Sequence, residues 1–141
     1  MLKILPDQML AFRPVADELL AERIVEHLRT AYADNSIHLP SRTLRLAEIA
    51  EDDLKAMVQT GLAQARSYQI THESALAGFV AVMFEVAPNF DSYPLMQQIL
   101  QDETTPPNAR LDLLMERATE EDWEKIKGSY DSAAWKLPLR V

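Results

Sequence analysis

The sequence contains no cysteine among its 141 residues. This absence excludes disulfide bonds, thiolate metal sites and cysteine nucleophiles. Glycine is nearly as scarce, with only Gly61, Gly78 and Gly128. Loops that cradle nucleotide phosphates are rich in glycine, and neither GxxxxGK[ST] nor GxGxxG occurs, so no nucleotide site is indicated. The shortage of turn glycines and the abundance of Leu, Ala, Glu, Met, Gln and Arg favour an all-α fold over a β-sandwich.

Long hydrophobic runs are lacking as well. The longest one covers ten residues, Ala75 to Phe84, whereas a helix that crosses a bilayer needs about 20. The N-terminal MLKILPDQML has one lysine and an apolar stretch broken by Pro6, which does not match the pattern of a signal peptide. We therefore expect a cytoplasmic protein that does not associate with membranes.

Basic residues are few, and the formal net charge is −8. Residues 51–141 account for −7 of this charge. A protein that binds DNA or RNA needs a basic face to neutralise phosphates, and none is visible, so we expect no nucleic-acid partner. An acidic surface suits either simple solubility or a basic protein partner.

Recognisable catalytic and metal-binding patterns are also missing. His27, His38 and His72 share no helical face, and the sequence has no HExxH or paired ExxH motif. No GxSxG motif places a serine beside a base. Neighbouring carboxylates at Asp52–Asp53 and Glu120–Asp122 fall at predicted helix N-termini, where the helix dipole accounts for them. We therefore predict no catalytic residue, no cofactor and no metal ion, and a protein that is not an enzyme.

The residues that are present predict one helical domain over residues 1–141, a compact bundle of six to seven helices with short connections. The expected helices cover about 14–33, 52–68, 72–87, 93–100, 105–116 and 119–135. Residues 1–13 are expected to form an N-terminal arm, residues 34–42 a connector and residues 136–141 a flexible tail. Residues 43–50 are ambiguous and allow one or two helical turns. Thr119 is the expected cap of the last helix, with Asp122 close to the pattern of a capping box.

The most apolar stretch, ALAGFVAVMFEV, spans residues 75–86. Thr71 can cap a helix here and Pro88 stops it, which gives the range 72–87. A helix that is apolar on all sides belongs in a protein core or in a membrane. Because this one is too short to span a bilayer, we expect it to be the central helix that the others surround.

Two residues of the central helix are not explained by a plain core. Gly78 costs about 1 kcal/mol relative to alanine inside a helix, and the close crossing of another helix, internal or from a partner, would offset that cost. Glu85 lies one turn before the helix end, where the dipole disfavours an anion. It either pairs with a cation, for which Arg66 and Arg110 are candidates, or reaches water.

The loop NFDSYP, residues 89–94, places two aromatic residues beside a carboxylate in a connector. Aromatic side chains in such a position either contact a partner or fold back over the core. The candidate partner-binding residues of this chain are therefore Gly78, Glu85, Phe90, Asp91 and Tyr93.

Three segments between Ala63 and Glu116 carry a family resemblance: ARSYQIT, FVAVMFEVAPNFDSYP and ILQDETTPPNARLDLLMER. They resemble a family of small helical proteins encoded beside type VI secretion effectors in Gram-negative bacteria. In that family a glycine follows the tyrosine of the first segment, the second contains G-P-x-F-D, and the third contains P-P-x-x-R. Gln69 and Ala87 stand where the family has its two glycines, and the first 60 residues match the family poorly.

Proteins at such loci are toxins, immunity proteins, or chaperones and adaptors that load toxins onto the secretion spike. Since no toxin chemistry is visible, the resemblance implies a protein-binding accessory role. We expect a chaperone or adaptor for a type VI effector. The alternative is an immunity protein that neutralises its toxin by direct binding, and a small helical enzyme of unknown chemistry is the third possibility.

Each of the two binding roles has a feature that suits it. Methionines on the expected helix faces suit a chaperone, because methionine surfaces adapt to different partners, although the same residues fit a plain core. They are Met57, Met83, Met96 and Met115. The acidic stretch 102–131 suits an immunity protein that faces a basic toxin. The oligomeric state is left open.

Overall fold

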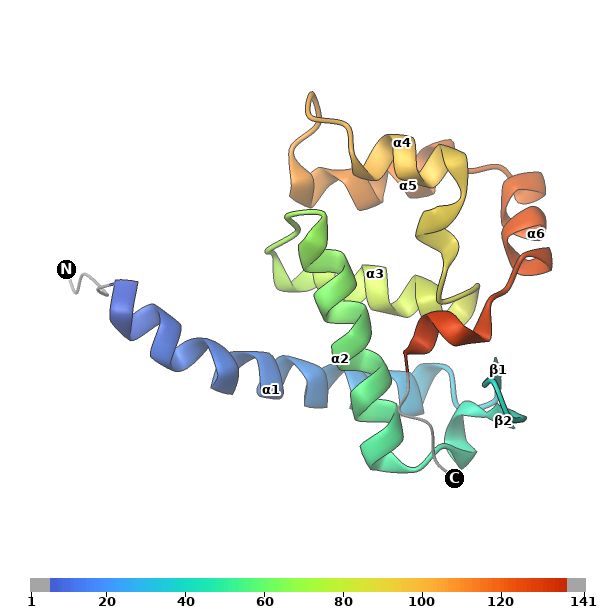
Figure 1. Cartoon of the computed structure of the whole chain (residues 1–141), viewed down its shortest axis with the longest axis horizontal. Helices are drawn as coiled ribbons and strands as arrows, with labels where there is room; N and C mark the ends of the chain where they lie inside the picture. The colour runs from blue at the N-terminus through green and yellow to red at the C-terminus, as the bar shows by residue number, and fades with distance from the viewer. Residues whose placement is uncertain (1–5, 137–141) are drawn as a thin grey trace.

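The structure, a computed structural model, describes the backbone of residues 6–136 and the side chains of residues 18–136 (Figure 1). Within this range the domain is mainly helical, as predicted, with a small sheet added. The helices are α1 Pro6–Ala31, α2 Glu51–Ser67, α3 Glu73–Glu85, α4 Pro94–Leu100, α5 Arg110–Arg117 and α6 Glu120–Gly128. The strands are β1 Ser36–His38 and β2 Thr43–Arg45. Short 3₁₀ turns occupy Leu46–Glu48, Phe90–Ser92, Pro107–Ala109 and Ser132–Trp135.

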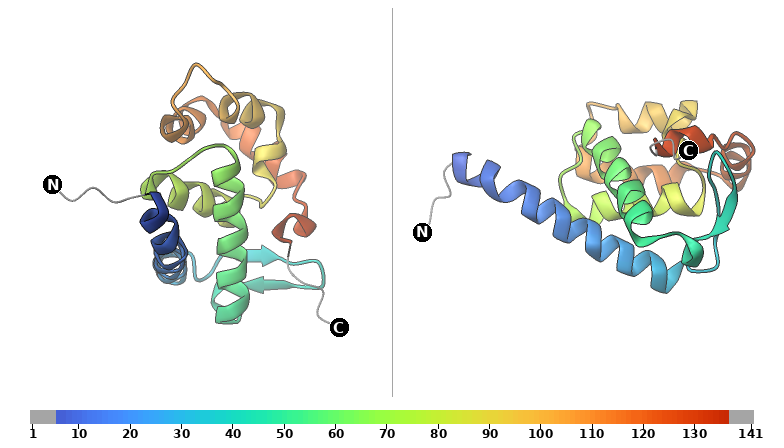
Figure 2. Two further views of the ribbon diagram at one scale, coloured as in Figure 1. Left: turned by 60° about the vertical axis from the view of Figure 1, so that its left-hand side comes forward. Right: turned by 60° about the horizontal axis from the view of Figure 1, so that its bottom comes forward.

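Helix α3 occupies the middle of the domain. It packs against α1, α2 and α5, and the views in Figures 1 and 2 place it between α2 and the pair α4–α5, with α1 crossing below. The N-terminal part of α1 extends beyond the other helices in the same views. The domain is therefore built around α3, while one end of α1 projects from it.

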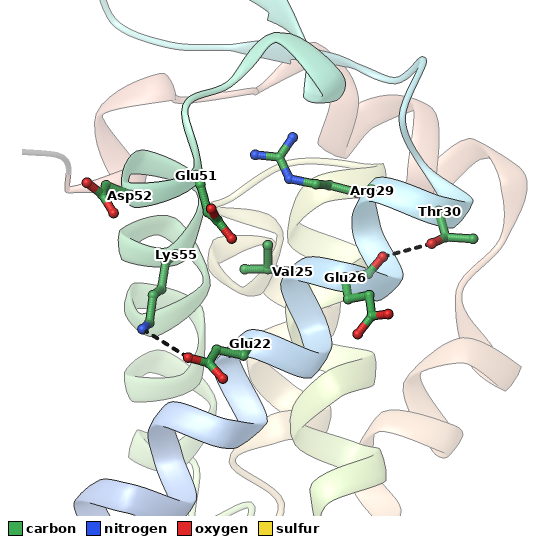
Figure 3. Close-up of a pocket in the computed structure, with 8 residues that line it drawn as sticks. All are labelled: Glu22, Val25, Glu26, Arg29, Thr30, Glu51, Asp52 and Lys55. Atoms are coloured by element: carbon green, nitrogen blue, oxygen red, sulfur yellow. Dashed lines mark hydrogen bonds and ion pairs between the residues drawn. The ribbon is translucent and has the colours of Figure 1, made fainter.

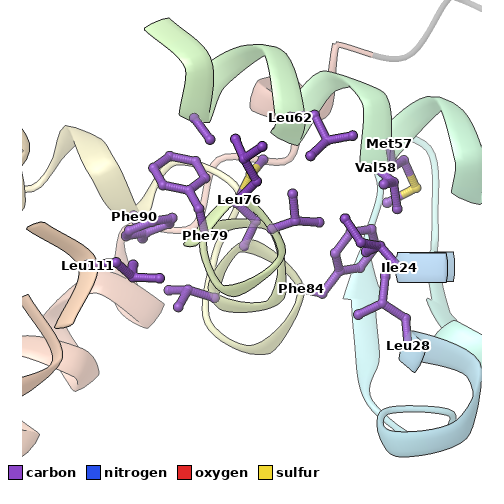
Figure 4. Packing of buried hydrophobic residues seen from close by; sticks show 14 of the residues in the cluster. Ile24, Leu28, Met57, Val58, Leu62, Leu76, Phe79, Phe84, Phe90 and Leu111 are labelled. Atoms are coloured by element: carbon purple, nitrogen blue, oxygen red, sulfur yellow. The ribbon is translucent and has the colours of Figure 1, made fainter. Parts of the chain in front are cut away.

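Apolar side chains from several elements form the core, and those of α3 point toward its neighbours (Figure 4). Its buried residues are Ala75, Leu76, Phe79, Val80, Val82, Met83 and Phe84. The expectation that helices enclose α3 on every side is only partly met, because Ala77, Gly78 and Ala81 are half-exposed and Glu85 is exposed. The three half-exposed residues, Ala77, Gly78 and Ala81, have the smallest side chains, so little apolar surface is left in water.

The predicted start of the first helix was wrong. Helix α1 begins at Pro6 and runs through Pro14, so residues 6–13 belong to the helix rather than to an arm. Proline fits the first helical position because its missing N–H has no partner there, and Pro6 takes that role. Pro14 lies inside the helix, where it removes one backbone hydrogen bond.

A hairpin occupies much of the connector expected at 34–42 and the first part of the ambiguous stretch 43–50, while the 3₁₀ turn Leu46–Glu48 is one of the helical turns allowed there. Strands β1 and β2 are antiparallel, with Ile37 opposite Leu44, and Ile37 is buried. The fold is therefore not purely α. Strands of three residues are too short for the apolar–polar alternation that reveals a strand in a sequence.

The last predicted helix, 119–135, is divided in the structure. Helix α6 ends at Gly128, and a separate turn, Ser132–Trp135, follows. Asp131 caps that turn by accepting a hydrogen bond from the N–H of Ala133 at 3.0 Å, because an aspartate favours local bonds to the backbone over helix continuation. Of the predicted tail only Lys136 is described; residues 137–141 lie outside the described range.

The cap expected at Thr71 was wrong: α3 begins at Glu73 with His72 as its N-cap residue, and neither side chain caps the helix. The backbone N–H groups of Thr71 and His72 both donate to Oδ1 of Asn108, at 2.9 and 2.8 Å. The Asn108 amide in turn donates to Oγ1 of Thr71 at 3.1 Å. One amide side chain from the loop before α5 thus satisfies backbone donors just before the central helix.

Candidate functional site

Gly78 faces helix α5 of the same chain. A Cβ atom built on Gly78 would lie 2.6 Å from Cδ2 of Leu111, which is closer than non-bonded carbon atoms approach. The close crossing expected from the sequence is therefore internal, and α5 accounts for the glycine without a partner.

Glu85 reaches solvent at the end of α3. No ion pair of Glu85 occurs among the described side chains, and Arg110, one of the two expected partners, donates to backbone carbonyls instead. The pKa of Tyr32 is raised, first by partial burial and then by the charge of Glu85. Of the two readings left open by the sequence, the geometry favours a carboxylate that reaches water.

Phe90 and Asp91 lie inside the protein. Phe90 is fully buried, with its ring centroid 4.9 Å from that of Phe79. Asp91 is 4% exposed, and its Oδ2 accepts hydrogen bonds from the Tyr68 hydroxyl at 2.8 Å and from Gln64 Nε2 at 2.6 Å. Burial and the neighbouring Asp91 raise the pKa of the Tyr68 hydroxyl. A partner could touch these two side chains only if the loop opened.

Tyr93 is half-buried and links two helices. Its hydroxyl donates to Oδ1 of Asp122 at 2.8 Å, and this bond joins the start of α4 to the first turn of α6. The pKa of Tyr93 is raised, mainly by its hydrogen bond to Asp122. The NFDSYP loop therefore folds back over the core, which was one of the two alternatives for its aromatic residues.

The methionines hold mostly core positions. Met57, Met83 and Met96 are buried, and Met115 is 51% exposed. Of the four methionines that suit an adaptable binding surface, only Met115 is available to a partner.

An acidic groove that the sequence did not reveal lies between α1 and α2 (Figure 3). Its volume is about 520 Å³. Eight residues line it: Glu22, Val25, Glu26, Arg29, Thr30, Glu51, Asp52 and Lys55. The groove joins the second half of α1 to the first turn of α2, so only the packing of these helices brings its carboxylates together.

The two cations of the acidic groove are already engaged. Lys55 Nζ lies 2.9 Å from Glu18 Oε1 and 3.7 Å from Glu22 Oε1, and the hydrogen bond to Glu18 raises the pKa of Lys55. Arg29 Nη2 donates to the carbonyl oxygen of Ile49 at 2.9 Å.

Three carboxylates of the groove, Glu26, Glu51 and Asp52, form no ion pair with any described side chain. They are exposed, and Glu51 and Asp52 stand in the first turn of α2, where the helix dipole stabilises them. Their negative charge is therefore available to a cationic group from outside.

A second acidic surface covers α5, α6 and the flanking loops. Its exposed acidic residues are Glu103, Asp112, Glu116, Glu120, Glu121, Glu124 and Asp131. Lysines on α6 neutralise two of them: Lys125 lies 3.2 Å from Glu121, and Lys127 lies 3.8 Å from Glu124. This surface is the one that the sequence predicted over residues 102–131.

Metal-binding clusters and membrane-spanning helices are absent from the described residues. Within the described residues no three His, Asp or Glu side chains gather as metal ligands would. No helix there has the length and apolar character needed to cross a membrane. Comparison of the chain with protein-family models, with curated proteins and with solved structures found no match.

Proposed function

We propose that this protein is a non-enzymatic accessory protein that binds another protein, and that its partner places a basic segment in the acidic groove between α1 and α2. The observation that carries the proposal is the group of exposed carboxylates Glu26, Glu51 and Asp52, which form no ion pair with the described side chains although Arg29 and Lys55 line the same groove of about 520 Å³.

The chemistry of the groove suits lysine or arginine side chains. Exposed ion pairs contribute up to about 1 kcal/mol each, and the carboxylates come from two packed helices, so several such contacts can form at once. Val25 gives the groove an apolar floor, against which the alkyl part of a long basic side chain can pack. A basic peptide segment satisfies both features.

The resemblance to proteins of type VI secretion loci supports the choice of role. On that basis the partner is a secreted effector, and the protein acts in the cytoplasm as its chaperone or adaptor. The acidic surface over α5 and α6 favours the alternative of an immunity protein that blocks a basic toxin.

Two genetic experiments separate these roles. For a chaperone, deletion of the gene lowers the abundance or export of the effector encoded beside it, and unchanged effector levels and secretion would refute this role. For an immunity protein, expression of the gene rescues cells that produce the toxin without any secretion machinery. Failure to rescue would dispose of the alternative.

Two charge-matched variants then locate the contact surface. The first changes the groove, with Glu26→Gln, Glu51→Gln and Asp52→Asn. The second changes the α5–α6 surface by the same charge, with Asp112→Asn, Glu116→Gln and Glu120→Gln. Affinity for the effector, measured by calorimetry, should fall at least tenfold for the groove variant only, since three charge-assisted contacts are lost. A loss confined to the second variant would move the interface to α5–α6.

A further inference from the structure

Arg110 is a buried cation at the start of α5. It is 5% exposed and forms no ion pair with the described side chains. Its Nε donates to the carbonyl oxygen of Thr105 at 3.1 Å, and its Nη1 donates to the carbonyl oxygens of Tyr68 and Leu100 at 3.1 and 2.8 Å. The three carbonyl groups accept hydrogen bonds from this guanidinium, but they are neutral and do not balance its charge. Burial of a charge without an opposite charge is costly.

The remaining nitrogen of the guanidinium, Nη2, has no acceptor among the described residues. No fully buried side-chain nitrogen or oxygen in that range lacks a hydrogen-bond partner, so Nη2 must keep access to the surface. A hollow of about 380 Å³ lies beside it, lined by Ser67, Tyr68, Gln69, Leu100, Gln101, Glu103 and Arg110. Nη2 is therefore a donor group without a bonded acceptor, on a residue that lines an open space.

Two carboxylates, Asp102 and Glu103, are near Arg110 and this hollow. Asp102 is occupied by Thr104 and Thr105, whose donors lie 2.6–3.1 Å from its oxygens. The hydrogen bonds from Thr104 lower the pKa of Asp102, and the charge of Arg110 adds a smaller effect in the same direction. Glu103 lines the hollow and is exposed. Their two negative charges disfavour a doubly charged phosphate and leave room for a group with a single negative charge.

We propose that this hollow binds a carboxylate group of a polypeptide, either an acidic side chain or a chain terminus. Nη2 of Arg110 donates to the carboxylate oxygens, and the side-chain amides of Gln69 and Gln101 stand at the same hollow as further donors. A bound carboxylate would balance the charge of the Arg110 guanidinium, which forms no ion pair with a described side chain. The site does not depend on the accessory role proposed above, and it lies apart from the acidic groove.

The test uses the full chain labelled with ¹⁵N and acetate as the probe. Sodium acetate is titrated against sodium chloride at equal ionic strength, and the amide signals of Gln69, Gln101 and Arg110 are followed together with the Nε–H signal of Arg110. Acetate should shift these signals to saturation, whereas chloride should not. Equal and unsaturated shifts with both salts would overturn the proposal.

Substitution of Arg110 could unfold the protein, so the variants alter the edge of the hollow instead. Glu103→Gln removes the competing carboxylate and should tighten acetate binding about threefold, and Gln101→Glu adds one and should weaken it about threefold. Gln59→Glu makes the same change on an exposed position of α2 that does not line the hollow, and it should leave the affinity unchanged. Equal effects of Gln101→Glu and Gln59→Glu would contradict a local site.

Three further probes identify the source of the group. N-acetylglycine should bind and N-acetylglycinamide should not, because only the first has a carboxylate. N-acetylaspartate amide carries its carboxylate on a side chain. If this probe binds and N-acetylglycine does not, the site is assigned to acidic side chains. Phosphate that binds more tightly than acetate would refute the carboxylate assignment.

Discussion

Gln69 has a backbone conformation that glycine adopts more readily. Its φ is 68°, in the left-handed region that is used just after a helix ends. Its N–H donates to the carbonyl oxygen of Arg66 at 2.8 Å, which closes the last turn of α2. A glycine would adopt this conformation without the steric cost that the Cβ atom of Gln69 brings.

Gln69→Gly should therefore raise the free energy of unfolding by about 1 kcal/mol. A side chain in the left-handed region costs about 1–2 kcal/mol, and part of this gain is offset because glycine loses more conformational entropy on folding. Urea unfolding measures the difference. Gln101→Gly is the matched control, since Gln101 follows α4 with φ −102° and has no strain to relieve. Lower stability for Gln69→Gly would show that its side chain contributes more than its backbone costs.

Single residues also show the limits of the sequence. The apolar composition of residues 75–86 predicted a core helix, and Gly78 within it predicted a close helix crossing. Both predictions follow from local rules. Which helix crosses at Gly78 was beyond reach, since Leu111 is distant in the chain. The burial of Asp91 was missed for the same reason: a carboxylate in a loop normally indicates solvent, and its donors, Tyr68 and Gln64, come from another helix.

Among the elements, α6 shows how a cap connects two helices. Thr119 Oγ1 accepts from the N–H of Asp122 at 3.2 Å, and Asp122 Oδ2 accepts from the N–H of Thr119 at 2.9 Å. The near-match to a capping box therefore functions as one. The other oxygen of Asp122 holds the hydroxyl of Tyr93, so the same carboxylate fixes α4 to α6.

The stabilisation by Asp122 should depend on pH. The backbone bond from Thr119, followed by the bond from Tyr93, lowers the pKa of Asp122 below its ordinary value of 3.8. A lowered folded-state pKa means that the contribution is complete near neutral pH and is lost as the pH falls through that value. Asp122→Ala should therefore lower the melting temperature near neutral pH, and the difference from the wild type should shrink in strong acid.

Thermal unfolding followed by circular dichroism at several pH values measures this effect. Tyr93→Phe serves as the control because it removes one donor and leaves the cap intact, so it should cause a smaller loss. A difference between Asp122→Ala and the wild type that is the same at all pH values would contradict a role for the ionised carboxylate.

Most of the elements could be predicted because their signals are local. Apolar spacing and prolines located α2, α3 and α4 to within two residues at each end. The hairpin has no comparable signal, since each strand has three residues. The groove between α1 and α2 depends on how the two helices pack, and no periodicity within either of them contains that information.

On the scale of the whole molecule, the C-terminal segment closes the domain. Trp135 is fully buried, and its ring centroid lies 4.6 Å from that of Phe84 on α3. Its indole N–H donates to the Tyr130 hydroxyl at 2.9 Å, and the same hydroxyl accepts from the backbone N–H of His38 in the hairpin at 3.3 Å. One short segment thus connects the core helix with the small sheet.

Trp135→Ala should lower the free energy of unfolding by about 3–5 kcal/mol, as expected for a fully buried aromatic side chain whose removal leaves a cavity. Trp123 on α6 is only half-buried, so Trp123→Ala should cost clearly less. Guanidinium unfolding of both variants measures the two values. Equal losses would mean that the C-terminal segment does not anchor the fold.

The cap that Asn108 supplies to α3 affects how the chain can be made. The ribosome releases the central helix well before it releases Asn108, which lies 37 residues beyond Thr71. Until then, the N–H groups of Thr71 and His72 have only water as a partner. The core helix of a nascent chain is therefore incomplete at one end, and its final docking waits for the loop before α5 to emerge.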